Sequence, residues 1–341
     1  MFSTMAPSTT SDSDPTGDAG DASFTLWQTR DVLRVIIACL AVLSNSMVII
    51  VIRLRHHMFR SFTNHLIWHQ AAIDAGSGVV LLLYTIGKKI PAISVLNQSS
   101  ESSRRDQLVC HFVYSEVFLW YFEVASTYNL VIISLERLVA ICHPVRHRNS
   151  WTRDKHKFAI VAAWSIAFVY GLPIAFFFEP HQGSCRAVDL QLGVQILVGV
   201  MSVTIEYLFP LSIMIYAYTR ILITLTKKIN NSADRQHNTL TKAKKNVLVT
   251  VLLASIMFVI CWTPVEVDHI DELFFANSFG QTTYDILTAL LACNMIANPI
   301  IYCFKYEHFR SQLRYLLKKP IRRNPESPEQ HMSLSITARE L

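Results

Sequence analysis

Several ionisable side chains lie within long apolar stretches of this 341-residue sequence. Asp74 interrupts one stretch, and Glu136 stands next to Arg137 near the end of another. Charged groups in such surroundings are costly unless they have a partner and a function. Neither a soluble core nor a simple membrane anchor needs an adjacent acid and base. The Glu136–Arg137 pair is therefore a candidate functional element.

Four glutamates form a second set of candidates: Glu116, Glu123, Glu206 and Glu266. Glu116 and Glu123 are seven residues apart, so on a helix they share one face. Several carboxylates together repel one another unless they are protonated or offered a cation. The set favours a cationic ligand, either an amine-bearing small molecule or a basic peptide. The alternative is that they are neutral acids that hydrogen-bond to tyrosine, asparagine or backbone carbonyl groups.

His65 and His69 have the i, i+4 spacing of a metal-binding pair on one helix face. This spacing raises the alternative of an intramembrane metal-dependent hydrolase or a transporter. No third ligand is identifiable in the sequence, and no serine-hydrolase or paired-aspartate protease motif accompanies the pair. We interpret the two histidines as polar residues at the start of the second apolar run.

The composition indicates a membrane protein, because 51% of the residues are hydrophobic and only 16% are charged. The apolar residues come in blocks long enough to cross about 30 Å of hydrocarbon. Seven such runs are predicted, near 31–54, 63–87, 108–142, 156–178, 191–226, 242–270 and 282–303. Helices are the open-ended structures that can cross, because lipid offers the backbone no hydrogen-bond partner.

Lysine and arginine concentrate after runs one, three and seven and before run six. The positive-inside rule therefore predicts an extracellular N-terminus and a cytoplasmic C-terminus. Residues 1–30 are predicted to be an extracellular disordered tail, and Asn97 begins a glycosylation sequence in a loop on the same side. The net charge of +6 is assigned to a basic cytoplasmic face rather than to nucleic-acid binding.

Short motifs follow one another along the seven runs. They are Asn45, Asp74, Glu136-Arg137-Leu138, Trp164, Pro210 with Tyr218, Phe258 to Pro264, and Asn298 to Tyr302. Together they resemble those of a rhodopsin-like (class A) G-protein-coupled receptor. The resemblance implies an all-α membrane protein, with a seven-transmembrane helix bundle over 31–303, a short amphipathic helix over 304–317 and a cytoplasmic tail over 318–341.

The same resemblance implies a receptor in the cell membrane rather than an enzyme. Its expected partners are an extracellular ligand, a heterotrimeric G protein, arrestin, a receptor kinase and membrane lipid, without nucleic acid. The implied G-protein switch comprises Glu136, Arg137, Tyr218, Asn298 and Tyr302. In this scheme Arg137 rests against Glu136 in the inactive state and turns toward the G protein and Tyr218 in the active state.

The implied activation core comprises Phe258, Trp262 and Pro264. Pro210, Pro264 and Pro299 are each expected to break a helix, because proline frees a backbone carbonyl and produces a kink. A kinked sixth helix is a plausible element with two positions, and its outward movement would activate the G protein.

Cys110 and Cys185 match the family's disulfide between the third span and the second extracellular loop. Counted back from Arg137, Cys110 lies two residues further out than the family pattern expects. The start of the third span is therefore expected to be irregular. The alternative is two free thiols.

No cofactor is expected, although one ion site is implied. Asp74, Ser126, Asn294 and Asn298 match positions that hold an allosteric sodium ion in relatives, and oxygen ligands suit a hard cation. Met295 stands where a further polar ligand is often found. The alternative is an aspartate that bonds only to asparagine and water.

The resemblance also places six residues around the ligand cavity: Glu116, Leu119, Glu123, Glu206, Trp262 and Glu266. Leu119 stands where monoamine receptors carry aspartate, and Ala292 stands where opsins carry the retinal-binding lysine. An ordinary aminergic pocket and a retinal Schiff base are therefore not expected. A proton-sensing receptor of the same fold is the alternative, with contributions from His111, His181 and His269.

Overall fold

The computed structural model describes residues 28–59, 61–94, 96, 103–150, 153–230, 238–275 and 280–318. The predicted N-terminal tail lies almost entirely outside these residues, and so does the C-terminal tail after Lys318. The predicted glycosylation site, Asn97, also lies outside them.

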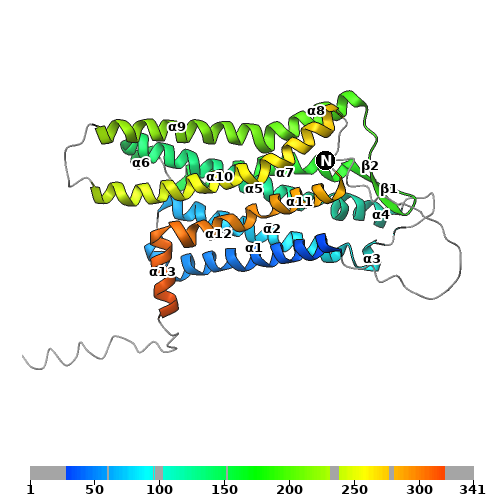
Figure 1. Ribbon diagram of the computed structural model, residues 1–341, viewed down its shortest axis with the longest axis horizontal. Helices are drawn as coiled ribbons and strands as arrows, with labels where there is room; N and C mark the ends of the chain where they lie inside the picture. Colours follow the sequence, from blue (N-terminus) through cyan, green and yellow to red (C-terminus); the bar gives the residue numbers. More distant parts are fainter. Residues whose placement is uncertain are drawn as a thin grey trace, which may run out of the picture.

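Long helices run side by side along one axis and form a bundle (Figure 1). They are α1 (Thr29–Leu54), α2 (Phe62–Gly87), α5 (Val117–Cys142), α7 (Arg153–Ile174), α9 (Phe209–Asn230), α10 (Asn238–Phe275), and α11 (Gln281–Ala292) followed by α12 (Asn294–Lys305). Among the described residues, six segments are long and apolar enough to cross a membrane, and α11 with α12 makes a seventh, bent by 42°. The predicted all-α seven-helix bundle is confirmed.

Shorter elements lie at the two ends of the bundle. α3 (Pro91–Ser94), α4 (Arg104–Val109), α8 (Leu192–Val203) and the hairpin of β1 (Phe178–His181) and β2 (Ser184–Ala187) lie toward one end. α6 (Pro144–Ser150) and α13 (Glu307–Lys318) lie toward the other, where α13 turns across the bundle (Figure 1). We call these the disulfide end and the Glu136 end.

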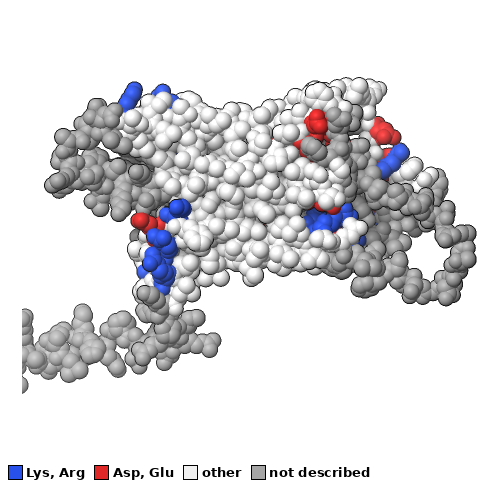
Figure 2. Space-filling view, viewed as in Figure 1, with Lys and Arg blue, Asp and Glu red and all other residues white. Residues whose placement is uncertain are grey.

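The sides of the bundle are apolar on their outer surface. Large hydrophobic side chains there are highly exposed, including Leu43, Phe158 and Val169 at 68%, 75% and 70%. On the face shown in Figure 2, Lys, Arg, Asp and Glu gather at the two ends of the molecule and leave the sides nearly free of charge. This surface suits hydrocarbon as a solvent, with the polar headgroups at either end.

The third span contains the irregularity that the position of Cys110 predicts. A π-helical turn, Cys110–Tyr114, separates α4 from α5 and is closed by Ser115 N, which donates to Cys110 O at 3.2 Å. Glu116 then takes a left-handed conformation with φ 51°, which side chains other than glycine rarely adopt. Cys110 forms the predicted disulfide with Cys185 in β2.

The fifth span consists of α8 and α9, joined by a π-helical turn, Thr204–Leu208, that ends two residues before Pro210. Phe209 N bonds to Thr204 O across this turn, so the usual α-helical partner, Ile205 O, is left free. Tyr128 OH from α5 donates to Ile205 O at 2.9 Å. The wider turn is therefore stabilised by a hydrogen bond from the neighbouring span. Such π-helical turns occur frequently at functional sites.

The seventh span breaks at Cys293, not at Pro299 as predicted. α12 continues through Pro299, whose ring nitrogen has no hydrogen to bond the carbonyl of Met295 four residues earlier. Asn45 Nδ2 from α1 donates to Met295 O at 2.8 Å and satisfies that carbonyl. A side chain thus replaces the missing backbone bond. The long α10 likewise continues through Pro264.

Candidate functional site

The Glu136 end holds a compact ionic cluster. Both Glu136 carboxylate oxygens accept hydrogen bonds from Arg137, from Nε at 2.6 Å and from Nη2 at 2.7 Å. Thr63 Oγ1 donates to Glu136 at 3.1 Å and also contacts Arg137 Nη2. His147 Nε2 lies 2.9 Å from Glu136, and because a carboxylate only accepts, the imidazole is the donor. The Glu136 side chain is 1% exposed, and Arg137 is held against it.

The two predicted switch tyrosines, Tyr218 and Tyr302, contact residues other than Arg137. Tyr218 OH lies 3.1 Å from Ser134 Oγ and accepts from Ser255 Oγ at 3.1 Å, so it joins α5 and α10 to α9. Tyr302 is buried with its ring beside Phe309 of α13. The structure therefore does not bring Tyr218 or Tyr302 into the Glu136–Arg137 cluster.

Tyr306, which links α12 to α13, ties this end of the bundle to α2. Its hydroxyl donates to Asn64 Oδ1 at 2.7 Å. Burial raises the pKa of Tyr306 to about 12, although the hydrogen bond to Asn64 acts in the opposite direction. The phenol therefore remains a neutral donor at physiological pH.

The middle of the bundle holds Asp74 with three hydrogen-bond donors. Gln70 Nε2 and Ser126 Oγ donate to Asp74 Oδ1 at 3.0 Å and 2.8 Å, and Asn298 Nδ2 donates to Oδ2 at 2.9 Å. Three of the four residues predicted to hold sodium are thus together. The fourth, Asn294, lies instead beside Glu123. Gln70 was not anticipated, although it precedes Asp74 by one helical turn on the same face.

A cavity of about 430 Å³ opens at the disulfide end between α1, α2, α5, α11 and α12. Glu116, Leu119, Glu123 and Ala292 are among the residues that line it. Glu123 lies seven residues further into the bundle than Glu116, about two helical turns deeper. The volume lies within the range of small-molecule pockets.

The acids near the mouth of this cavity are paired with bases. Arg34 and Lys88 reach the same Glu116 oxygen at 2.6 Å and 2.8 Å. Lys89 reaches Asp31 at 2.6 Å. Arg30 lies 3.7 Å from Asp285. These pairs use side chains from α1, α11 and the residues after α2, and they were not anticipated, because the partners are far apart in sequence.

Glu123 differs from the acids near the mouth. It is 3% exposed, and neither of its carboxylate oxygens has a hydrogen-bond partner among the described residues. The hydroxyl of Ser77 and the side chain of Asn294 lie beside it, and Asp74 is close enough to interact with it electrostatically. Ser77 Oγ is itself without a described partner. An acid group buried in this way is an open acceptor at the inner part of the cavity.

The structure separates the four glutamates into two groups. Glu206 and Glu266 lie between the fourth, fifth and sixth spans, where Tyr170 OH donates to Glu206 Oε2 at 2.6 Å. Among the described residues that line the cavity, neither of these two acids appears. Glu116 and Glu123 line the cavity, whereas Glu206 and Glu266 face each other and His269.

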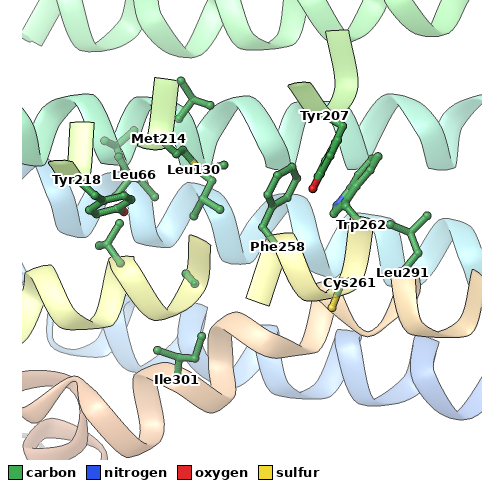
Figure 3. Close-up of a cluster of buried hydrophobic side chains, with 14 of the residues drawn as sticks. Leu66, Leu130, Tyr207, Met214, Tyr218, Phe258, Cys261, Trp262, Leu291 and Ile301 are labelled. Atoms are coloured by element: carbon green, nitrogen blue, oxygen red, sulfur yellow. The ribbon is translucent and has the colours of Figure 1, made fainter. Parts of the chain in front are cut away.

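The aromatic residues of the predicted activation core are buried in the central cluster (Figure 3). Trp262 and Phe258 are both 0% exposed, with ring centroids 5.6 Å apart. Tyr207 stacks at 5.9 Å from Phe258, and its hydroxyl lies 2.6 Å from Thr263 Oγ1. Trp262 is predicted to line the ligand cavity, but it is not among the described residues around the 430 Å³ space.

The histidine pair does not form a metal site. His69 Nδ1 bonds Asn129 Oδ1 at 2.8 Å, and His69 Nε2 accepts from Trp164 Nε1 at 3.0 Å. Both ring nitrogens are used, and His65 is exposed. The spacing of His65 and His69 therefore gives no support for a metal-dependent hydrolase. Of the histidines proposed for proton sensing, His111 bonds Ala175 O at 2.8 Å. His181 is exposed, whereas His269 is buried.

Comparison with known proteins agrees with this geometry. Residues 44–302 match the family described as 7 transmembrane receptor (rhodopsin family). The substance-K receptor of Canis lupus familiaris is 27% identical over 321 residues, which cover 85% of this chain and 74% of the relative. The trace amine-associated receptor 7d of Mus musculus is 23% identical over 306 residues, with 85% and 82% covered.

The somatostatin receptor type 5 of Bos taurus is 26% identical over 294 residues, which cover 84% of this chain and 75% of the relative. These proteins are receptors and not enzymes. The family match spans every long helix of the bundle from within α1 to within α12. The chain belongs to the rhodopsin family of seven-transmembrane receptors.

Proposed function

We propose that this receptor binds a cationic ligand from outside the cell and activates a heterotrimeric G protein inside it. Family membership implies G-protein coupling and an extracellular ligand.

The unpaired carboxyl group of Glu123 carries the ligand proposal. The mouth acids Asp31 and Glu116 already have basic partners, so a ligand cation gains little by approaching them. Glu123 has none and is deep in a cavity of small-molecule size. An ammonium or guanidinium group placed there would neutralise a buried acid and form charge-assisted hydrogen bonds.

Two ligand classes fit this chemistry, an amine-bearing small molecule and a basic peptide that inserts one cationic group. The relatives include receptors named for trace amines, substance K and somatostatin. In a peptide, the remaining residues would contact the charged mouth of the cavity. Both classes share the requirement for one cation at Glu123.

Replacement of Glu123 by glutamine tests the proposal, with Glu206→Gln as the matched control. Both glutamates are at most 3% exposed, but only Glu123 lines the cavity. A second-messenger assay in cells would use a panel of amines and basic peptides, each with an N-acylated, uncharged counterpart. An active compound should lose about tenfold to hundredfold in potency on Glu123→Gln, the worth of one charge-assisted contact.

In that assay, Glu206→Gln should leave the potency within about threefold of the wild type. Glu206 does not line the cavity, and residues without shared contacts act nearly independently. Equal potency of an agonist and its uncharged counterpart would contradict the proposal. A signal produced by acid alone, between about pH 7.5 and 6, would instead favour proton sensing.

For orientation, we propose that the disulfide end faces outside and the Glu136 end faces the cytoplasm, in the cell membrane. The basic residues of α13 and of the loops at the Glu136 end support this assignment. The G protein would then meet Arg137, and arrestin and a receptor kinase would act on the same face and on the tail over 318–341. Lipid would contact the apolar sides, and residues 1–30 would be an extracellular tail.

For activation, we propose that a ligand at Glu123 acts on the aromatic residues Phe258 and Trp262 and moves α10 outward. Arg137 would then leave Glu136. A sodium ion near Asp74 is a further proposal, supported by the open oxygens of Ser77 and Glu123 beside the Asp74 group. Sodium-dependent agonist affinity that disappears in Asp74→Asn would support it, and equal affinity with and without sodium would oppose it.

A further inference from the structure

We propose that Glu206, Glu266 and His269 form a second site, which binds a divalent transition-metal ion of the Zn²⁺ class. One ligand atom from each of the three side chains lies within 4.8 Å of the other two. The residues come from the fifth and sixth spans and do not line the 430 Å³ cavity. The proposed ion is therefore distinct from the ligand that Glu123 binds.

The backbone places these three groups together. Glu266 and His269 are three residues apart on α10 and so share one face of that helix. Glu206 lies within the π-helical turn Thr204–Leu208 of the fifth span. All three side chains belong to buried residues, exposed by 1%, 2% and 6% for Glu206, Glu266 and His269.

Acceptor atoms in this group remain open. Glu266 Oε2 is buried and has no hydrogen-bond partner among the described residues. Glu206 and Glu266 lie within hydrogen-bonding range of each other, so a shared proton or a dication must offset the repulsion of two ionised carboxylates. A dication would neutralise both and use the open atoms.

The donor set selects the kind of metal. One imidazole nitrogen and two carboxylate oxygens match Zn²⁺, which binds three protein ligands and leaves a fourth position for water or another ligand. Ca²⁺ requires six to eight oxygen ligands, more than this group offers. The three ligand atoms lie up to 4.8 Å from one another. Zn²⁺ binds N and O at about 2.0–2.2 Å, so small side-chain rotations would bring these atoms to the shorter spacing of a tetrahedral site.

Tyr170 acts as a positioning residue for this site. Its hydroxyl donates to Glu206 Oε2 at 2.6 Å, which fixes the orientation of the carboxylate. Removal of such an outer-shell partner typically weakens metal affinity by about 10–100-fold. Tyr170→Phe keeps the ring and removes only the hydroxyl.

The test is a Zn²⁺ titration of the purified full-length receptor in detergent, with thermal unfolding as the readout. Zn²⁺ should raise the unfolding temperature in a saturable manner with one ion per receptor. Glu266→Gln and His269→Gln should each weaken the apparent affinity at least about tenfold. His181→Gln removes an exposed histidine from β1 and should leave the affinity unchanged, which controls for surface binding.

A paired substitution keeps the test decisive if a variant is less stable. His269→Cys supplies another zinc ligand and should retain the Zn²⁺-dependent stabilisation, whereas His269→Ser should lose it. Zn²⁺ affinity equal to the wild type in Glu266→Gln and His269→Ser would overturn the proposal. So would the absence of saturable stabilisation below about 1 mM Zn²⁺. The titration needs neither agonist nor G protein, so its failure would not affect the receptor proposal.

Discussion

Substitution of Glu136 by glutamine should raise signalling in the absence of ligand. In the structure, Glu136 accepts two hydrogen bonds from Arg137 and one each from Thr63 and His147. Glutamine has nearly the same shape but no charge, and its amide nitrogen cannot accept. The substitution therefore weakens the restraint on Arg137 without creating a cavity.

The size of the effect follows from those contacts. A hydrogen bond to a charged group contributes about 1.5–3 kcal/mol net. Glutamine removes one such acceptor and the negative charge at position 136. The closed state should therefore lose on the order of 1.5–3 kcal/mol of stabilisation relative to the active state. Because about 1.4 kcal/mol changes an equilibrium tenfold, the active population should rise about tenfold to hundredfold before it saturates.

The assay is ligand-free nucleotide exchange on a heterotrimeric G protein, measured per purified receptor. Thr63→Val removes one hydroxyl contact to the carboxylate but leaves the Glu136–Arg137 ion pair in place, so it should raise the rate less than Glu136→Gln. A rate for Glu136→Gln equal to the wild type, from receptor of normal stability, would refute the view that this cluster holds the closed state.

Four further substitutions test the fold. Asn45→Ala leaves the Met295 carbonyl without a donor and should cost about 1–3 kcal/mol, seen as a lower unfolding temperature; no change would show that another group satisfies it. Cys110→Ser and Cys185→Ser should each lower surface expression, and the double variant should be no worse, since closing the 75-residue interval is worth about 4–5 kcal/mol in the loop-entropy model. Gly78→Ala places a Cβ 3.0 Å from a backbone oxygen of α1 and should destabilise the α1–α2 contact by about 1–3 kcal/mol.

The sequence predicts most of the fold because the relevant signals are local. Span length, hydrophobic blocks and charge distribution require no knowledge of neighbouring helices. The irregular start of the third span was also predictable, because the position of Cys110 relative to Arg137 implies extra residues there. The break at Cys293 was not, because Pro299 is compensated by Asn45 from another helix.

The candidate site was only partly predictable. The pairing of Glu136 with Arg137 follows from adjacency, but the contacts of Thr63 and His147 depend on tertiary packing. The four glutamates looked like one cluster because each lies in the outer half of a span. Side-chain direction separates them, because Glu116 and Glu123 line the cavity whereas Glu206 and Glu266 meet His269 between the fifth and sixth spans. Ion pairs such as Arg34 with Glu116 have a sequence separation of 82, too far for a local pattern to indicate.

We propose that a cation in the cavity at the disulfide end drives nucleotide exchange through Arg137 at the other end. The most direct measurement is exchange by purified receptor and G protein with and without an active amine or basic peptide. Ligand-stimulated exchange should be lost in Arg137→Ala and should need about tenfold to hundredfold more ligand in Glu123→Gln. Unchanged stimulation in both variants would contradict it.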